Sequence, residues 1–132
     1  MTTRPAPRPT ADSAVYWNAI SRRELVAQRC SNCAKLRHPP RPMCPHCHSV
    51  AWDEQHLAGT GRLYSYAVLH HPRSPLFEYP VLAALVDLDE GVRIVTNLVG
   101  VEPSDIRIGM RLAVEFEPTN DAGTVPVFRP LP

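Results

Sequence analysis

From residue 51 to the C-terminal end, short runs rich in apolar residues are separated by turn-forming residues; most alternate between two faces, and the run over 81–88 is nearly continuously apolar. This pattern predicts β-strands, because a period of two residues places apolar side chains on one face of a sheet. The expected strands cover residues 51–57, 62–70, 81–88, 92–99, 111–117 and 125–128. A helical turn is expected between the fourth and the fifth of these runs. The last five strands and this turn predict a short antiparallel barrel of the OB-fold type, in a mainly β protein.

A helical arm is predicted near the N-terminus, over residues 14–20, with a second short helix or turn near 21–25. Its apolar residues do not form one clean stripe, and Tyr16 and Trp17 add bulky rings. Two interpretations remain open. The arm lies on a partner protein, with Tyr16, Trp17 and Ile20 as interface candidates, or its aromatic residues pack on the protein's own ribbon.

The four cysteines of the chain follow a short predicted strand over residues 25–29. They form two Cys-x-x-Cys pairs that are separated by ten residues. Two facing pairs of this spacing bring four thiolates around one tetrahedral Zn²⁺ ion. The sequence therefore predicts a rubredoxin-like zinc ribbon with a structural Zn²⁺ whose ligands are Cys30, Cys33, Cys44 and Cys47.

Other roles fit the two cysteine pairs less well. Two disulfides would need an oxidising compartment, and a thioredoxin-like redox site would need a single pair within a βαβ unit. A catalytic zinc usually keeps an open coordination position, which four cysteines would close. Ala34 and His48 follow the two pairs at places where glycine is common, because glycine permits a positive φ. Replacement of one cysteine ligand by His46 or His48 is the alternative, and the favoured interpretation of both histidines is a solvated side chain beside the metal.

The length of 132 residues fits one domain, or two small modules that share a core. We expect a disordered lead-in over 1–10, a helical arm over 11–26, a zinc ribbon over 27–50 and an OB-fold domain over 51–132. The chain has no run of about eighteen apolar residues, and its Pro- and Arg-rich N-terminus lacks the apolar stretch of a signal peptide. We therefore expect no membrane contact and a cytoplasmic protein, where cysteines stay reduced for metal binding.

Charge is distributed unevenly, although the formal net charge is only +1. Residues 1–50 carry eight Arg and Lys side chains against two acids, a net of +6. Residues 51–132 carry six basic side chains against eleven acids, a net of −5. The ribbon half can therefore attract anions, whereas the barrel half repels them.

Several further motifs occur in an order and spacing that resemble a known family. In chain order, the matching segments are Trp17, the four cysteines, Pro39-Pro40-Arg41, Gly59-Thr60-Gly61, Tyr64-Ser65-Tyr66, Val86-Asp87-Leu88-Asp89-Glu90-Gly91-Val92-Arg93, Asn97-Leu98-Val99-Gly100, Ile108-Gly109-Met110 and Phe128-Arg129-Pro130. They span nearly everything from Val15 to Pro130. The chain resembles the bacterial and archaeal proteins that join a rubredoxin-like zinc ribbon to an OB-fold domain and accompany acyl-CoA enzymes.

The resemblance implies a non-catalytic subunit that assembles with a thiolase-fold enzyme, such as a thiolase, an acyltransferase or an aldolase that shortens steroid side chains. It also implies that the subunit helps to hold the acyl-CoA substrate of its partner. Coenzyme A carries phosphates, and guanidinium groups bind phosphate in bidentate fashion. The candidate residues for this contact are Arg37, Arg41 and Arg62.

Two other functions are weaker. A single-stranded nucleic-acid binder would use Tyr64 and Tyr66 as a stacking platform, but the negative barrel half disfavours a polyphosphate ligand. An enzyme would need a catalytic constellation. His70 and His71 are neighbours on a predicted strand and point to opposite faces. The chain has no Ser-His-Asp arrangement and no glycine-rich phosphate loop, so we expect no turnover by this chain alone.

Overall fold

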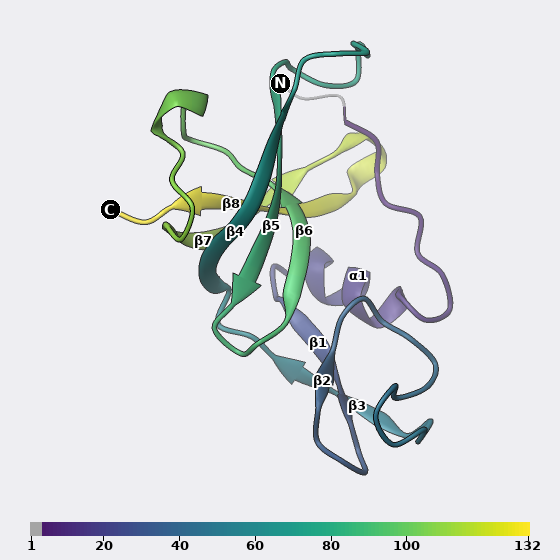
Figure 1. Ribbon diagram of the computed structural model, residues 1–132. Coiled ribbons are helices and arrows are strands. Elements are labelled where there is room, and N and C mark those ends of the chain that lie inside the picture. The colour runs from purple at the N-terminus through teal and green to yellow at the C-terminus, as the bar shows by residue number, and fades with distance from the viewer. Residues whose placement is uncertain (1–3) are drawn as a thin grey trace.

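The computed structural model describes residues 4–132, which form two β-sheets and one α-helix (Figure 1). The N-terminal part contains α1 (Ala14–Ser21), β1 (Val26–Cys30), β2 (Leu36–Arg37) and β3 (Trp52–His56). The strands that follow are β4 (Thr60–Leu69), β5 (Val81–Leu88), β6 (Arg93–Asn97), β7 (Arg111–Pro118) and β8 (Thr124–Pro130). Two short 3₁₀ helices, one before and one after β7, are η1 (Pro103–Asp105) and η2 (Asn120–Ala122).

The first sheet is a small antiparallel ribbon with the strand order β2-β1-β3. The pairing of β1 with β3 runs from Val26 opposite His56 to Cys30 opposite Trp52. All residues of β1 except Arg29 are buried. The first cysteine therefore stands at the end of a strand that the rest of the protein holds in place.

The second sheet curves into a nearly closed barrel. Its strand order is β6-β5-β4-β7-β8, and each neighbouring pair is antiparallel. The two outer strands meet through a parallel bridge between Leu98 and Phe128, where the Val99 N–H donates to the Phe128 carbonyl at 2.9 Å. This topology, with η1 between the third and the fourth barrel strand, confirms the predicted OB-fold.

The barrel interior is filled by side chains at alternate positions of the strands. In β5, Leu82, Ala84, Val86 and Leu88 are buried, and the residues between them are partly exposed. The sequence predicted this segment as a nearly continuous apolar run, and its alternating burial arises from its place in the barrel wall. Phe128 of β8 is completely buried and is the largest side chain that is fully enclosed.

A β-bulge interrupts the alternation in β4. Leu63 pairs with Val86, but Ser65 pairs with the next residue, Leu85, so Tyr64 is left without a partner of its own. A bulge moves every later side chain of a strand to the opposite face relative to simple alternation. The second half of β4 therefore does not continue the pattern of its first half.

The helix α1 lies between the ribbon and the barrel (Figure 1). Tyr16 and Ile20 of α1 belong to the same hydrophobic cluster as two residues of the ribbon. These are Leu25, which precedes β1, and Ala27, which lies in β1. The same cluster contains the core residues of the barrel, including Phe128. The two sheets therefore share one core, and the helix joins them.

Residues 4–10 run along the barrel before α1. The Arg4 side chain donates to Glu117 at 2.9 Å and to Asn97 at 2.5 Å, and the Asn120 N–H donates to the Arg4 carbonyl at 3.0 Å. The first three residues of the lead-in that was predicted over 1–10 lie outside the described residues. Within the part of the chain that the structure describes, no helix is both long and apolar enough to span a membrane.

Candidate zinc centre and interaction surfaces

The two cysteine pairs form two turns with the same hydrogen bonds. In the first turn, the Ala34 N–H donates to the Cys30 carbonyl at 2.9 Å, and the Cys30 N–H donates to the Lys35 carbonyl at 3.0 Å. In the second turn, the His48 N–H donates to the Cys44 carbonyl at 3.0 Å, and the Cys44 N–H donates to the Ser49 carbonyl at 2.9 Å. Each turn therefore presents two sulfur atoms on one side, as a zinc knuckle requires.

The four cysteine Sγ atoms lie within 4.8 Å of one another. The Sγ atoms of Cys30 and Cys47 are 3.5 Å apart, and those of Cys33 and Cys44 are 3.7 Å apart. A disulfide would need about 2.05 Å, so all four are free thiols. Zn–S bonds of about 2.3 Å in a tetrahedron separate the sulfurs by roughly 3.8 Å. The four cysteines therefore fit a tetrahedral zinc ion, as the sequence predicted.

Backbone amides point at two of the sulfur atoms. The Cys33 N–H lies 3.5 Å from Cys30 Sγ, and the His46 N–H lies 3.4 Å from Cys44 Sγ. The Cys33 amide is the main reason why the pKa of the Cys30 thiol falls to about 6. The Cys47 amide is the main cause of a lowered pKa at Cys44. Since the thiolate is the form that binds metal, these amides favour the ligating state.

Ala34 and His48 adopt left-handed backbone conformations, with φ values of 64° and 66°. Glycine is common at such positions because a Cβ atom disfavours this region. Both residues are exposed, so nothing prevents the turns from forming with their side chains present. The departure from glycine therefore affects local backbone strain and leaves the sulfur geometry intact.

Arg37, a predicted coenzyme A contact, is buried behind the zinc turns and is only 6% exposed. Its Nε donates to Gln28 Oε1 at 2.8 Å, and its Nη2 donates to the Arg41 carbonyl at 3.0 Å. The Arg41 N–H donates to the same Gln28 oxygen at 2.8 Å. Arg37 therefore fixes the segment between the cysteine pairs and does not present its guanidinium to a ligand.

The other two candidate arginines keep exposed side chains. Arg41 lies in the segment between the cysteine pairs, and only its backbone takes part in the network just described. Arg62 lies on β4 of the barrel. The pKa of Asp89 is lowered mainly by hydrogen bonds from Arg111 and Thr60, and the charge of Arg62 adds a smaller effect. The Arg62 Nη1 donates to the Gly109 carbonyl of the barrel at 3.2 Å.

The three interface candidates of the helical arm differ in exposure. Ile20 is completely buried and Tyr16 is 6% exposed, because both side chains enter the shared core. Trp17 is only partly buried, and its ring stands edge-on to Tyr16 with the ring centres 4.9 Å apart. Of the three, only Trp17 offers surface to a partner, and the other two correspond to packing within the chain.

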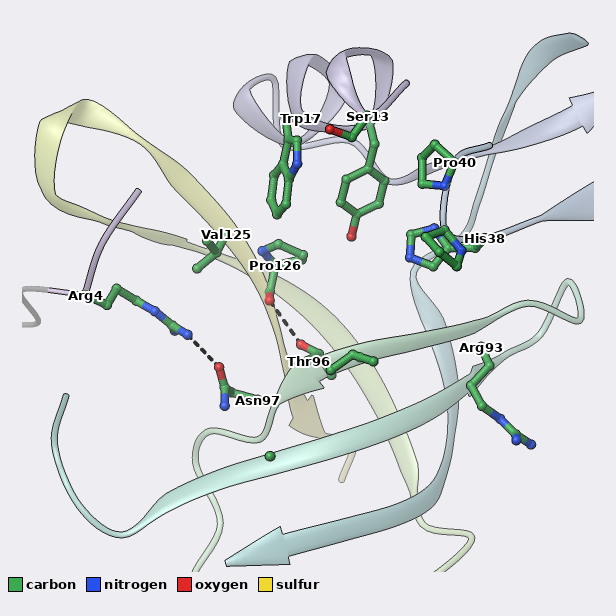
Figure 2. Close-up of a pocket in the computed structure, with 14 residues that line it drawn as sticks. Arg4, Ser13, Trp17, His38, Pro40, Arg93, Thr96, Asn97, Val125 and Pro126 are labelled. Atoms are coloured by element: carbon green, nitrogen blue, oxygen red, sulfur yellow. Dashed lines mark hydrogen bonds between the residues drawn. The ribbon is translucent and has the colours of Figure 1, made fainter. Parts of the chain in front are cut away.

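An apolar groove of about 520 Å³ lies where α1, the segment between the cysteine pairs, β6 and β8 come together (Figure 2). Figure 2 shows Trp17 of α1 opposite Val125 and Pro126 of β8, with Thr96 and Asn97 of β6 on another side. His38, Pro39 and Pro40 close the end nearest the ribbon. The sequence analysis missed this groove, because its walls come from segments far apart in the chain.

The carboxylates of Asp87 and Asp89 are held in ion pairs on the barrel surface. Asp87 accepts from Arg93 Nε at 2.6 Å, and Asp89 accepts from Arg111 Nη1 at 2.7 Å. The pKa of Asp87 is lowered by its hydrogen bond with Arg93. These carboxylates are therefore ionised side chains that fasten strands and turns.

The tyrosine platform predicted for a nucleic-acid binder is not formed. The bulge places Tyr66 opposite Ala84, a core residue, whereas Tyr64 lies on the outer side under Arg93. The Arg93 guanidinium is 3.4 Å from the centre of the Tyr64 ring. The two rings therefore do not share a face, and the half-exposed Tyr64 ring stacks with the Arg93 guanidinium.

Two known families match the chain. The family described as "ChsH2, rubredoxin-like zinc ribbon domain" matches residues 17–53, and the family described as "ChsH2, C-terminal OB-fold domain" matches residues 54–117. Both matches agree with the two sheets of the structure, since the first ends within β3 and the second covers β4 to β7.

Curated relatives include proteins of two lengths. The chain is 51% identical over 127 residues to a "Probable enoyl-CoA hydratase alpha subunit" of Thermomonospora curvata, covering 96% of this chain and 40% of that protein. It is 34% identical over 110 residues to a "DUF35 domain-containing scaffold protein" of Methanocaldococcus jannaschii, covering 81% of this chain and 78% of that protein. The chain thus spans less than half of the hydratase subunit and most of the scaffold protein.

Solved structures that share the fold include one at high and one at low sequence identity. A chain described as "Ltp2-ChsH2(DUF35) aldolase" superposes with a TM-score of 0.90 at 51% identity, covering 94% of this chain and 98% of that chain. A DUF35 family protein of unknown function from Sulfolobus solfataricus superposes with a TM-score of 0.66 at 14% identity, covering 92% and 86%. The second likeness concerns the fold alone.

Proposed function

Because the chain belongs to the ChsH2 and DUF35 family of zinc-ribbon and OB-fold proteins, we propose that it is a non-catalytic accessory subunit of an acyl-CoA enzyme. It assembles with a thiolase-fold partner, which is a thiolase, an acyltransferase or a steroid side-chain aldolase, and helps to hold the acyl-CoA substrate. The observation that carries the proposal is the likeness, over almost the full length of both chains, to a component of an Ltp2-ChsH2 aldolase.

The chemistry of the described residues supports a non-catalytic role. The cysteines form a four-sulfur donor set, which leaves a bound zinc without an open coordination position. Asp87 and Asp89 are neutralised by arginines, and His70 and His71 are exposed at the end of β4. The cysteines and the two aspartates therefore have structural roles, so the reacting groups of the complex would come from the partner.

The surface supports assembly through the ribbon side of the molecule. Trp17 keeps part of its ring exposed, and large aromatic residues are enriched at protein interfaces. Arg41 and Arg62 keep exposed guanidinium groups for the phosphates of coenzyme A. Arg37 is left out of this role because its side chain is buried.

The proposal is tested by producing the chain alone and together with a thiolase-fold candidate partner from the same organism. We expect one complex on size-exclusion chromatography and acyl-CoA turnover that the complex has and this chain lacks. Two purified proteins that elute separately, with full activity in the partner alone, would refute the proposed role.

The coenzyme A contact is tested separately, within the complex. Arg62→Ala and Arg41→Ala should each raise the KM for acyl-CoA by about tenfold, since one charge-assisted hydrogen bond to phosphate contributes roughly 1.5 kcal/mol. Arg107→Ala is the matched control, because this exposed side chain bonds only to the carbonyls of Ser104 and Ile106. An unchanged KM in both test variants would remove these arginines from the substrate site.

A further inference from the structure

The strand β6 has one free edge. Within residues 4–132 its sheet neighbour is β5, and its contact with β8 lies near its C-terminal end, at the Leu98–Phe128 bridge and at the hydrogen bond from Thr96 Oγ1 to the Pro126 carbonyl. The Leu88 N–H donates to the Val92 carbonyl at 2.8 Å, and the Leu98 N–H donates to the Leu82 carbonyl at 3.0 Å. These two bonds fix which residues of the strand face β5.

Alternate residues of β6 therefore direct their backbone groups to the free edge. In an antiparallel ladder, residues that bond to the neighbouring strand alternate with residues whose N–H and C=O point away from it. The backbone groups of Ile94 and Thr96 bond to β5, as those of Val92 and Leu98 do. The backbone N–H and C=O groups of Arg93, Val95 and Asn97 therefore point away from β5. The central one, Val95, is 74% exposed.

The free edge borders the apolar groove. Val95, Thr96 and Asn97 form one wall, and Val125 and Pro126 of β8 lie across from them. Near this end the two strands are joined by a side chain, since Thr96 Oγ1 donates to the Pro126 carbonyl at 3.0 Å. The barrel thus closes at the Leu98–Phe128 bridge and opens into the groove at the other end.

The Tyr16 hydroxyl is a hydrogen-bond donor in the groove that has no partner among the described residues. Tyr16 lines the groove and is 94% buried, and its hydroxyl makes no hydrogen bond to any of residues 4–132. Burial raises the pKa of this hydroxyl, so it stays a neutral donor. Trp17, Pro39 and Pro40 add apolar surface around it. The groove offers apolar walls, a phenol donor and a strand edge.

The charges of the groove exclude an ionic occupant. Among residues 4–132, the charged side chains that line it are Arg4 and Arg93, and carboxylates already neutralise both, from Glu117 at 2.9 Å and Asp87 at 2.6 Å. Figure 2 shows Arg93 pointing away from the other labelled side chains of the groove. A phosphate or a nucleic-acid backbone would find no unpaired cation here. A neutral polypeptide segment can pair with the strand edge, accept from the Tyr16 hydroxyl and pack on the apolar walls.

We propose that β6 pairs with an extended, apolar segment of the partner enzyme, which lies in the groove as an added strand. This rests on the proposed function, because the segment belongs to the thiolase-fold subunit. Backbone groups of the segment pair with Val95, and one of its carbonyls accepts from the Tyr16 hydroxyl. Its alternate side chains lie against Trp17 and Val125, so Trp17 is part of the same interface.

The test substitutes the central edge residue in the complex. Val95→Pro removes the outward N–H, and proline is tolerated on an edge strand whose N–H faces solvent. We expect its Kd for the purified thiolase-fold subunit to rise at least tenfold, with zinc content and thermal midpoint kept. Val95→Ala is the matched control, since it retains the N–H, and it should stay within about threefold of the wild type. Tyr16→Phe, which removes only the hydroxyl, should weaken binding severalfold.

Hydrogen exchange of the wild-type protein gives a second measurement that does not depend on a variant that folds. The Val95 amide should exchange fast in the free chain and at least tenfold slower in the complex. Unchanged exchange at Val95, or equal Kd values for Val95→Pro and the wild type, would overturn the proposal and leave the accessory role standing. A groove that holds a second copy of this chain would give a dimer that Val95→Pro dissociates, which also overturns it. If the wild-type chain binds no thiolase-fold subunit, both proposals fail together.

Discussion

At the scale of single residues, the zinc turns show a conflict between side chain and backbone. Ala34 and His48 occupy the left-handed region, which costs roughly 1 kcal/mol or more for a residue with a Cβ atom. The repeated spacing of the cysteines predicted both turns and the donor set, because the pattern is local. Arg37 was predicted as a coenzyme A contact, but its side chain is buried against Gln28 on another strand, and no local pattern reveals that pairing.

Relieving this backbone strain should stabilise the protein. Ala34→Gly and His48→Gly should each raise the free energy of unfolding by about 0.5 kcal/mol, because the strain removed exceeds the added entropy of the unfolded chain. Thermal unfolding of the zinc-loaded protein measures the effect. Ala51→Gly, at an exposed residue without a positive φ, should give no gain. A lower midpoint in both glycine variants would contradict this account of the turns.

A buried histidine should make stability depend on pH. Burial lowers the pKa of His38 below its usual value near 6.5, so the folded protein binds this proton less readily than the unfolded chain. Stability should therefore decline as the pH falls below about 6.5, until the folded-state pKa is reached. His38→Phe keeps a ring beside Tyr16, whose centre lies 5.1 Å away, and should flatten this decline.

Thermal midpoints between pH 5 and pH 8, with zinc content followed in parallel, measure the contribution of His38. The exposed His70 provides the control, because His70→Gln should keep the wild-type slope. Equal slopes for His38→Phe and the wild type would show that this proton does not affect folding.

At the scale of elements, an apolar run bounded by turn residues was the most predictable strand. The segment 81–88 was predicted with the bounds that β5 has, because it is a nearly continuous apolar run that ends at the turn residues Asp89, Glu90 and Gly91. The bulge at Tyr64 was not predictable, since it depends on how β4 aligns with β5 across the sheet. The short helix or turn expected near 21–25 is a turn, in which Arg23 has a φ of 61°.

The close approach of β4 and β5 requires a glycine at position 61. A Cβ atom there would lie 2.4 Å from the Asp87 carbonyl oxygen and 3.0 Å from the Leu88 Cα, and backbone cannot move aside as a side chain can. Gly61→Ala should therefore lower the free energy of unfolding by about 1–3 kcal/mol. Urea unfolding measures this loss, and the exposed substitution Ala67→Ser on the same strand should be nearly neutral. Wild-type stability in Gly61→Ala would show that the two strands lie farther apart.

The two faces of α1 should separate folding from assembly. Ile20→Ala should lower the free energy of unfolding by about 2–5 kcal/mol, because the side chain is fully buried in the shared core. Trp17→Ala should cost less stability but weaken the complex with the thiolase-fold subunit, since part of its ring is exposed. Urea unfolding and a binding titration on the same samples distinguish the two. Full binding by Trp17→Ala would move the interface away from this helix.

At the scale of the whole molecule, the ribbon and the barrel behave as one unit. A single hydrophobic cluster runs from Leu25 and Ala27 through α1 into the barrel. The sequence predicted each half separately, but it did not decide whether the arm packs on a partner or on its own chain. That choice depends on the surface that the barrel presents, which no local pattern describes. The groove beside β6 escaped prediction for the same reason.

Zinc removal should therefore destabilise the entire chain. A structural zinc contributes of order 10 kcal/mol to the folding of a small ribbon, and here the ribbon completes the core of the barrel. We expect one zinc per chain by elemental analysis, and a single, much lower unfolding transition after chelation. A barrel that melts at an unchanged temperature after complete loss of zinc would show that the two sheets are independent.

The most direct measurement of the central claim is a titration of the purified thiolase-fold subunit with this chain, following acyl-CoA turnover. We predict activity that rises with added chain, saturates at a fixed stoichiometry and is lost with the Val95→Pro variant at the same concentration. Turnover by the partner that is complete before any of this chain is added would contradict the claim that it serves as an accessory subunit.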